Sequence, residues 1–145
     1  MTTTMKETGM ALVPQAIGWT ATMGLFPGYG HDNAPDRRAD RVSLLKAAWG
    51  REMETCHERT RFSISCVMTD ATVLYPAAGG CPEGGEDSIT LTGSSNPRYV
   101  RPDELEAFMD AVESVVKAVQ IAMEQTSCRI EFTPIIRSVY SRIED

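Results

Sequence analysis

The stretch FSISCVMTDATVLYPAAGGCPEGGEDSITLTG, residues 62–93, decides the fold, because it sets two strand patterns around a glycine-rich loop. Its apolar residues alternate with small polar ones at Phe62, Ile64, Cys66 and Met68 before the loop, and at Ile89 and Leu91 after it. A period of two is typical of a strand with one buried face. Two consecutive strands are therefore predicted, and the glycine loop lies between them.

The segment TVLYP, residues 72–76, has two interpretations. It can extend the strand that begins near Phe62, or it can return from a turn at Thr69 and Asp70. Periodicity does not decide between these, so both stay open at this point. If the segment extends the strand, the glycine loop that follows is a hairpin connection.

A strand and a helix are predicted before this stretch. Residues 17–25 alternate apolar and small polar side chains, with Ile17, Trp19, Ala21, Met23 and Leu25 on one side. The loop FPGYGHDNAP, residues 26–35, then breaks regular structure. Three- and four-residue spacing follows, as in a helix of about 20 residues, at Val42, Leu45, Ala48, Trp49, Met53 and Cys56. Asp36 or Asp40 is expected to cap its start.

A second helix and a last strand follow the stretch. An unbroken amphipathic stripe runs through Leu105, Phe108, Met109, Val112, Val115, Val116, Val119 and Met123. Pro102 and a capping box formed by Asp103 and Glu106 are expected to start this helix. CRIEF, residues 128–132, predicts a strand with Ile130 and Phe132 inward, and Pro134 limits or bends it.

The order strand, helix, strand, strand, helix, strand fits an α+β fold, a ferredoxin-like split βαβ sandwich with two helices on one face of an antiparallel sheet. We expect a flexible N-terminal arm at residues 1–15 and a single domain at 16–145. The other sheet face has no helix, so a homo-oligomer is predicted. Trp19 and Phe62 would lie near its interface if their side points away from the helices.

Composition excludes several classes of function. The net charge of −6 argues against nucleic-acid binding, which needs Lys and Arg facing phosphates. No segment approaches the roughly 20 apolar residues that span a bilayer, and the first residues lack a basic and apolar leader. We therefore expect no membrane partner and a cytoplasmic location. The 4 cysteines show no C-x-x-C spacing, so no disulfide framework, metal site or cofactor is implied.

We expect a ligand site where the loops 26–35 and 94–101 meet. In the predicted topology the first and third strands are taken as adjacent and parallel, so both loops and both helix N-termini lie at one end of the sheet. The candidate ligand-binding residues are Phe26, Tyr29, His31, Asn33, Ser95, Asn96, Arg98, Tyr99 and Arg101, with Ser94 beside them. Arginines, amides and aromatic rings suit a phosphate- or carboxylate-bearing molecule. The alternative is an ordinary turn with solvated arginines.

If TVLYP extends the second strand, the glycine loop is predicted at the opposite end of the sheet from this site. It has no lysine, and Glu83, Glu86 and Asp87 would repel a phosphate, so it does not resemble a nucleotide-binding loop. The same acids disfavour a thiolate at Cys81, which argues against a catalytic cysteine. We interpret the loop as a flexible hairpin connection that packs on a neighbouring subunit.

Three functions follow from these observations, and no catalytic residue is assigned. The first is a non-enzymatic protein that sequesters a small anionic metabolite, such as a nucleotide-like one, as an oligomer. The second is an interaction or assembly protein that uses the glycine loop. The third is a small isomerase, cyclase or hydrolase that uses His31 or Cys81. The binding protein is preferred, because no set of nucleophile, base and orienting group can be found in the sequence.

Overall fold

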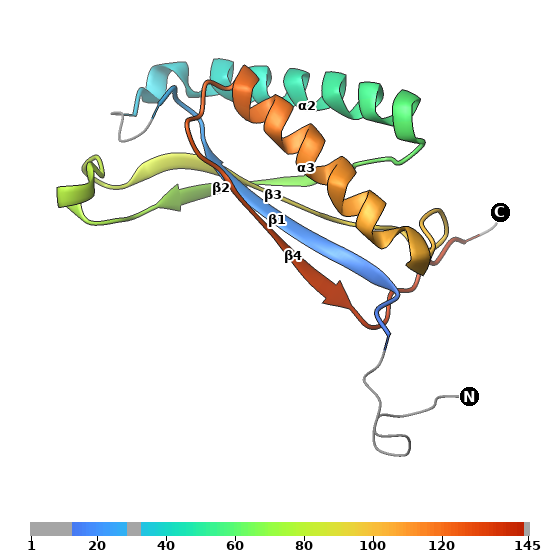
Figure 1. Ribbon diagram of the computed structural model, residues 1–145. Helices are drawn as coiled ribbons and strands as arrows, with labels where there is room; N and C mark the ends of the chain where they lie inside the picture. Colours follow the sequence, from blue (N-terminus) through green and yellow to red (C-terminus); the bar gives the residue numbers. More distant parts are fainter. Residues whose placement is uncertain (1–12, 29–32, 144–145) are drawn as a thin grey trace, which may run out of the picture.

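A computed structural model describes residues 13–28 and 33–143 of the chain. Within these residues it has four strands and two long helices (Figure 1). The elements are β1 (Ala16–Gly24), α2 (Arg38–Thr60), β2 (Val67–Val73), β3 (Glu86–Ser94), α3 (Leu105–Ala122) and β4 (Arg129–Ile135), with 3-10 turns η1 (Pro35–Arg37), η2 (Ala77–Gly79) and η3 (Pro102–Glu104). Most of the arm predicted at 1–15 lies outside the described residues.

The four strands form one antiparallel sheet in the order β2-β3-β1-β4. Both helices cover the same face of it, as Figure 1 shows. This is the predicted α+β sandwich, so the fold class is confirmed. The order arises because β2 and β3 form a hairpin, and β3 then inserts between β2 and β1.

The core lies between the sheet and the helices. Trp19, 3% exposed, stacks on Trp49 of α2 with ring centroids 5.7 Å apart, and Phe62 packs edge-on against Phe108 of α3 at 5.8 Å. The indole N–H of Trp49 donates to the carbonyl of Ile64 at 3.1 Å. Trp19 and Phe62 therefore point toward the helices, and the suggestion that they lie near a subunit interface on the other face is wrong.

The helix-free face of the sheet is rich in threonine. Alternation along the strands puts Thr20 and Thr22 of β1 on this face, opposite Thr92 and Thr90 of β3. The hydroxyls of Thr22 and Thr90 are 3.0 Å apart and share a hydrogen bond. This face is thus polar, and no helix of the described residues covers it.

The predicted elements are present, with shifted boundaries. The segment TVLYP extends the strand rather than returning from a turn, because β2 runs to Val73 and pairs with β3 throughout. The strand begins at Val67, five residues later than Phe62. Ile130 and Phe132 of β4 are partly buried against the core, as expected, and Pro134 is tolerated because β4 is an edge strand.

Neither predicted helix cap is formed as expected. Helix α2 follows the turn η1, which has Pro35 at its start, and no side chain caps either element. Before α3, the backbone N–H of Arg101 donates to Glu104 at 2.9 Å, so the reciprocal contact lies two residues earlier than the predicted pair. In both cases a proline-initiated 3-10 turn precedes the helix and moves its first residue.

The expectation that the first and third strands are parallel is wrong. Gly18 pairs with Ser94 and Gly24 with Ser88, so β1 and β3 are antiparallel. The crossover through α2 makes β2 run in the same direction as β1. The hairpin between β2 and β3 then makes β3 run opposite to both. The loops after β1 and β3 therefore lie at opposite ends of β1, about 20 Å apart at roughly 3.3 Å per residue. The glycine loop shares the end of the sheet with the loop after β1.

Candidate functional site

The loop after β1 is tied to the end of the glycine loop. The side-chain amide of Asn33 donates to the carbonyl of Gly85 at 2.8 Å, and its oxygen accepts from the backbone N–H of Asp87 at 2.9 Å. Arg38 binds Asp87 through Nε at 2.9 Å and Asp70 through Nη2 at 2.8 Å. The hydrogen bond to Asp70 is the main cause that raises the pKa of Arg38. This end of the sheet is thus held by both polar and ionic contacts.

A hollow of about 280 Å³ lies at the same end, on the helix-free face. The residues lining it include Thr22, Gly24, Val73, Tyr75, Glu86, Ser88, Gln125 and Arg129. The hydroxyl of Tyr75 donates to Oε2 of Glu86 at 3.1 Å. Because side chains alternate along a strand, Glu86 faces this hollow while Asp87 faces the helices and binds Arg38. We call the hollow the acidic pocket, after Glu86.

Gly24 leaves room for two polar side chains at this pocket. A Cβ added to Gly24 would lie 2.7 Å from Oε1 of Gln125 and 3.0 Å from Oε1 of Glu86. Gln125 is 8% exposed and donates to the carbonyl of Phe26 at 2.6 Å. The missing side chain therefore lets the carboxylate of Glu86 lie close to the backbone of β1.

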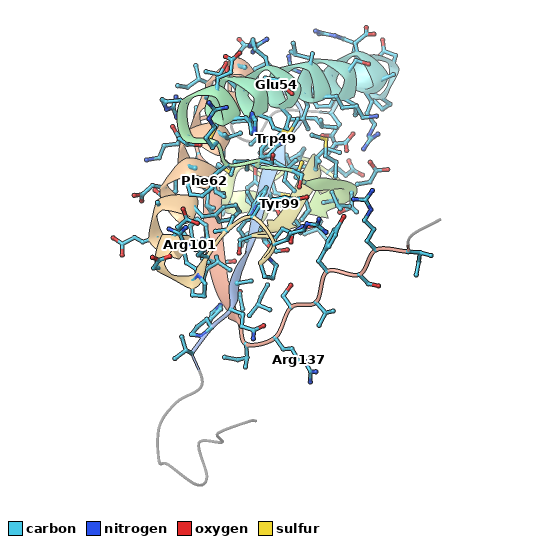
Figure 2. All side chains as sticks on the ribbon, turned by 90° about the vertical axis from the view of Figure 1, so that its right-hand side faces the viewer. Trp49, Glu54, Phe62, Tyr99, Arg101 and Arg137 are labelled. Carbon is cyan, nitrogen blue, oxygen red and sulfur yellow. The ribbon has the colours of Figure 1, made fainter. Side chains whose placement is uncertain are left out.

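A second pair of hollows lies at the opposite end of the sheet. One, of about 370 Å³, is lined by His57, Arg61, Phe62, Ser63, Ser65, Ser94, Asn96, Tyr99 and Val100. The other, of about 350 Å³, shares Ser65, Ser94 and Asn96 with it and reaches Tyr140 in the C-terminal segment. Figure 2 labels Phe62, Tyr99 and Arg101 in this part of the molecule. We call the first of these the basic hollow, because His57 and Arg61 line it.

Phe26 and Asn33, the described candidate residues of the first loop, do not line a common wall. Phe26 is 9% exposed and belongs to the hydrophobic core. Asn33 uses its amide for the two bonds to the chain around Glu86. Tyr29 and His31 lie outside the described residues. Because β1 and β3 are antiparallel, the loop after β1 does not meet the loop at 94–101, and the predicted convergence of the two loops is wrong.

The candidate residues of the second loop lie near the basic hollow. Ser95 is 1% exposed, and its hydroxyl accepts from the backbone N–H of Ile17 at 2.9 Å. The oxygen of Asn96 accepts from the N–H of Arg98, whose guanidinium lies over the rings of Tyr99 and Tyr140. Arg101 forms an exposed ion pair with Asp103 at 3.2 Å, which is the arrangement expected if this segment is an ordinary turn with solvated arginines. Ligand binding by these residues stays a prediction.

The thiols of Cys66 and Cys128 are partly buried, and that of Cys81 is hydrogen-bonded to the nearby backbone. Burial raises the pKa of Cys66 to about 11 and also raises the pKa of Cys128. Cys81 donates to the carbonyl of Pro82 at 3.4 Å.

In the described part of the chain, His, Cys, Asp and Glu form no group of three able to hold a metal ion. Over the same residues, no helix is both long and apolar enough to cross a bilayer.

Sequence reasoning missed the pair Tyr75 and Glu86. In the sequence, Glu86 is one of three acids expected to repel a phosphate, and Tyr75 belongs to the segment TVLYP, which either extends a strand or returns from a turn. The usable signal was their position, since they stand at the two ends of the glycine loop and a hairpin brings such ends together. That signal required TVLYP to be one strand, which the pattern left open.

The described residues form a small α+β domain with a hollow on the helix-free face of its sheet. The chain belongs to the SAM lyase family, whose family model matches residues 16–140. No curated protein matches the chain. Among solved structures, a phage SAM lyase in complex with S-methyl-5'-thioadenosine is 15% identical, with 93% of this chain and 95% of that chain covered and a TM-score of 0.49.

The preferred sequence-based function, a non-enzymatic sequestering protein, is wrong. Membership of a lyase family indicates an enzyme. The coarser part of the expectation, a small-molecule ligand, is confirmed. The sequence shows no nucleophile paired with a base, but that absence does not exclude an enzyme.

Proposed function

We propose that this protein cleaves S-adenosylmethionine at the bond between the sulfonium and the four-carbon amino-acid chain. Membership of the SAM lyase family over residues 16–140 is the observation that carries this proposal. We place the reaction in the acidic pocket. A lyase breaks the bond without adding water, so the site must hold the substrate in a reactive shape rather than activate a water molecule.

The charge of the substrate favours the acidic pocket over the basic hollow. S-adenosylmethionine has two cationic groups, a sulfonium and an ammonium, and one carboxylate. Carboxylates and aromatic faces attract such cations. Glu86 and Tyr75 offer both, whereas His57 and Arg61 at the other end offer positive or neutral groups. Arg129, which also lines the acidic pocket, supplies an opposite charge for the substrate carboxylate.

The chemistry requires one bond to form and one to break. The carboxylate oxygen of the substrate attacks its own γ-carbon, the C–S bond breaks with its electron pair on sulfur, and the products are a five-membered lactone and methylthioadenosine. Atoms and charges balance without water, base or oxidant. An intramolecular attack held in the correct geometry gains a large effective concentration. Opposite charges cancel as the bond forms, which a partly dehydrated pocket favours.

In this proposal Glu86 binds the cationic part of the substrate and Tyr75 orients Glu86. The 3.1 Å hydrogen bond from the Tyr75 hydroxyl fixes one carboxylate oxygen. The other, Oε1, lies close to Gly24, where no side chain intervenes. A carboxylate held in this way loses little rotamer freedom on binding, so more of the interaction remains for the substrate.

The test is direct product analysis by NMR. Purified protein is incubated with S-adenosylmethionine in ¹⁸O-labelled water, and we expect methylthioadenosine and unlabelled homoserine lactone. Glu86→Gln is expected to lower kcat/KM about 100-fold, on the order of 3 kcal/mol for a charged contact. Glu83→Gln, which changes an exposed acid of the same loop, is the control. No cleavage by the wild-type protein would refute the proposed function, and full activity of Glu86→Gln would refute the pocket.

We also propose a homo-oligomer that covers the helix-free face. Its support is the threonine-rich surface of β1 and β3, which no helix of the described chain covers. Sedimentation at working concentration is expected to give a multiple of the 15.9 kDa chain mass. A single-chain mass would remove this part of the proposal. A cytoplasmic location and one domain at 16–145 remain part of it.

A further inference from the structure

At the acidic pocket, β3 extends beyond its neighbour β1. The last regular pair of the two strands is Gly24 with Ser88, and one more backbone bond follows, from the N–H of Leu25 to the carbonyl of Asp87 at 3.0 Å. Beyond this point β1 turns away into the loop. The N–H of Asp87 and the carbonyl of Gly85, which face the same side as the carbonyl of Asp87, are left without a strand partner.

Asn33 supplies the missing partner. Its carboxamide has a donor and an acceptor, like a backbone peptide group. The donor binds the carbonyl of Gly85 at 2.8 Å and the acceptor binds the N–H of Asp87 at 2.9 Å. These two groups belong to the residues immediately before and after Glu86. The side chain therefore replaces one rung of the sheet, and Glu86 is the residue that this rung encloses.

The helix-facing side of the same strand is also fixed. Arg38, at the start of α2, binds both carboxylate oxygens of Asp87, at 3.2 Å and 2.9 Å, and reaches Asp70 on β2. Asp87 and Glu86 are neighbours that point to opposite faces. Holding the backbone through Asn33 and the next side chain through Arg38 leaves Glu86 little freedom to rotate out of the acidic pocket.

We propose that Asn33 is a positioning residue for Glu86, acting on it through the two flanking peptide groups. This inference rests on the proposed function. Asn33 is not among the residues that line the pocket, and its two bonds are to the backbone on either side of Glu86, so its effect is transmitted by the backbone. It sets the direction of the Glu86 carboxylate, on which the rate depends more steeply than substrate affinity does.

The test compares Asn33→Ala and Asn33→Asp with a matched control. Thr60→Ala is that control, because the Thr60 hydroxyl also donates to one backbone carbonyl, that of Cys56, and accepts from one backbone N–H, that of Phe62. It lies at the far end of α2. We expect kcat for S-adenosylmethionine to fall at least tenfold in Asn33→Ala with KM within threefold. Asn33→Asp, which keeps the acceptor, should recover part of the loss, and Thr60→Ala should retain kcat at a similar loss of stability.

A second measurement separates this inference from the proposed function. The side-chain carboxyl carbon of Glu86 is observed by NMR in each folded variant, with no substrate present. Its resonance is expected to move in Asn33→Ala and to stay in Thr60→Ala. If the wild-type protein fails to cleave S-adenosylmethionine, the proposed function falls and the NMR comparison still decides the positioning role. An unmoved resonance, or a wild-type kcat in Asn33→Ala, overturns the inference.

Discussion

The hydroxyl of Tyr75 and the carboxylate of Glu86 meet at 3.1 Å from opposite ends of the glycine-rich loop. The loop thus closes a hairpin whose two base residues form a hydrogen-bonded pair on the helix-free face. Its glycines serve this closure, since Gly80, Gly84 and Gly85 have positive φ angles of 98°, 82° and 95°. The loop is thus the hairpin connection that the sequence predicts, and it brings the two residues of this pair together.

Replacing Tyr75 with phenylalanine is expected to lower kcat about tenfold and leave KM within threefold. The ring stays in the pocket, but the hydrogen bond to Glu86 is lost, which is worth about 1.5 kcal/mol for a charged acceptor. Initial rates over a range of S-adenosylmethionine concentrations measure both constants. Tyr140→Phe removes a hydroxyl at the other end of the sheet and serves as control. Equal kinetic constants for Tyr75→Phe and wild type would contradict the orienting role.

Adding a methyl group at Gly93 is expected to destabilise the fold by about 1–3 kcal/mol, as overpacking does. The new Cβ would lie 2.6 Å from the backbone oxygen of Ser65 and 2.7 Å from Nε1 of Trp19. At Gly50, in α2, nothing lies within 4 Å of the added atom. Gly50→Ala should therefore stabilise the protein by about 0.5–1 kcal/mol. Urea unfolding measures both, and shifts of the same sign would contradict this account.

Replacing Arg41 with methionine is expected to reduce the free energy of unfolding by about 1–3 kcal/mol. Arg41 is 7% exposed and donates to the carbonyls of Leu25 at 2.6 Å and Met123 at 3.0 Å. Its replacement removes the hydrogen bonds that these two buried carbonyl oxygens accept from it. Arg51→Met is the control, because Arg51 pairs only at the surface with Glu52 in the described structure. Its effect should stay within about 0.5 kcal/mol. Thermal and urea unfolding of both variants decide the comparison.

Alkylation of Cys66 is expected to be slow at neutral pH and to accelerate up to high pH. Burial raises the pKa of this thiol to about 11, from an ordinary value of 9.0. Only the thiolate reacts, so at pH 8 about one thiol in a thousand is reactive, against about one in ten for an ordinary cysteine. Iodoacetamide labelling followed by peptide mass analysis should show a rate that rises roughly tenfold between pH 9 and pH 10. A rise of less than about twofold, as for a thiol with the ordinary pKa, would contradict the burial effect.

The fold could be predicted from the sequence because the two periodicities are clear in each element. Trp19 and Met23 repeat with a period of two, and Val112, Val115 and Val119 repeat with helical spacing. The order of such elements limits the topology to few choices. Strand direction, by contrast, must be derived from that topology. Taking β1 and β3 as parallel moved the loop at 94–101 to the wrong end of the sheet.

The candidate site could not be predicted to the same extent. Glu86 and Asp87 are adjacent acids, and one faces the pocket while the other binds Arg38. The register of β3 decides which of the two acids faces the pocket, because a shift of one residue would exchange the faces of Glu86 and Asp87. Asn33 is a candidate ligand-binding residue in the sequence, whereas its bonds in the structure, to Gly85 and Asp87, connect segments more than 50 positions apart. No local pattern contains that contact.

The two end segments of the described chain lie together, far from the acidic pocket. The N–H of Ser138 donates to the side chain of Gln15 at 3.3 Å, beside the start of β1, whereas the pocket lies where β1 finishes. Nine residues of extended strand separate the two places by about 25 Å. An affinity tag or a solid support attached near residue 13 or residue 143 is therefore directed away from the pocket of its own chain.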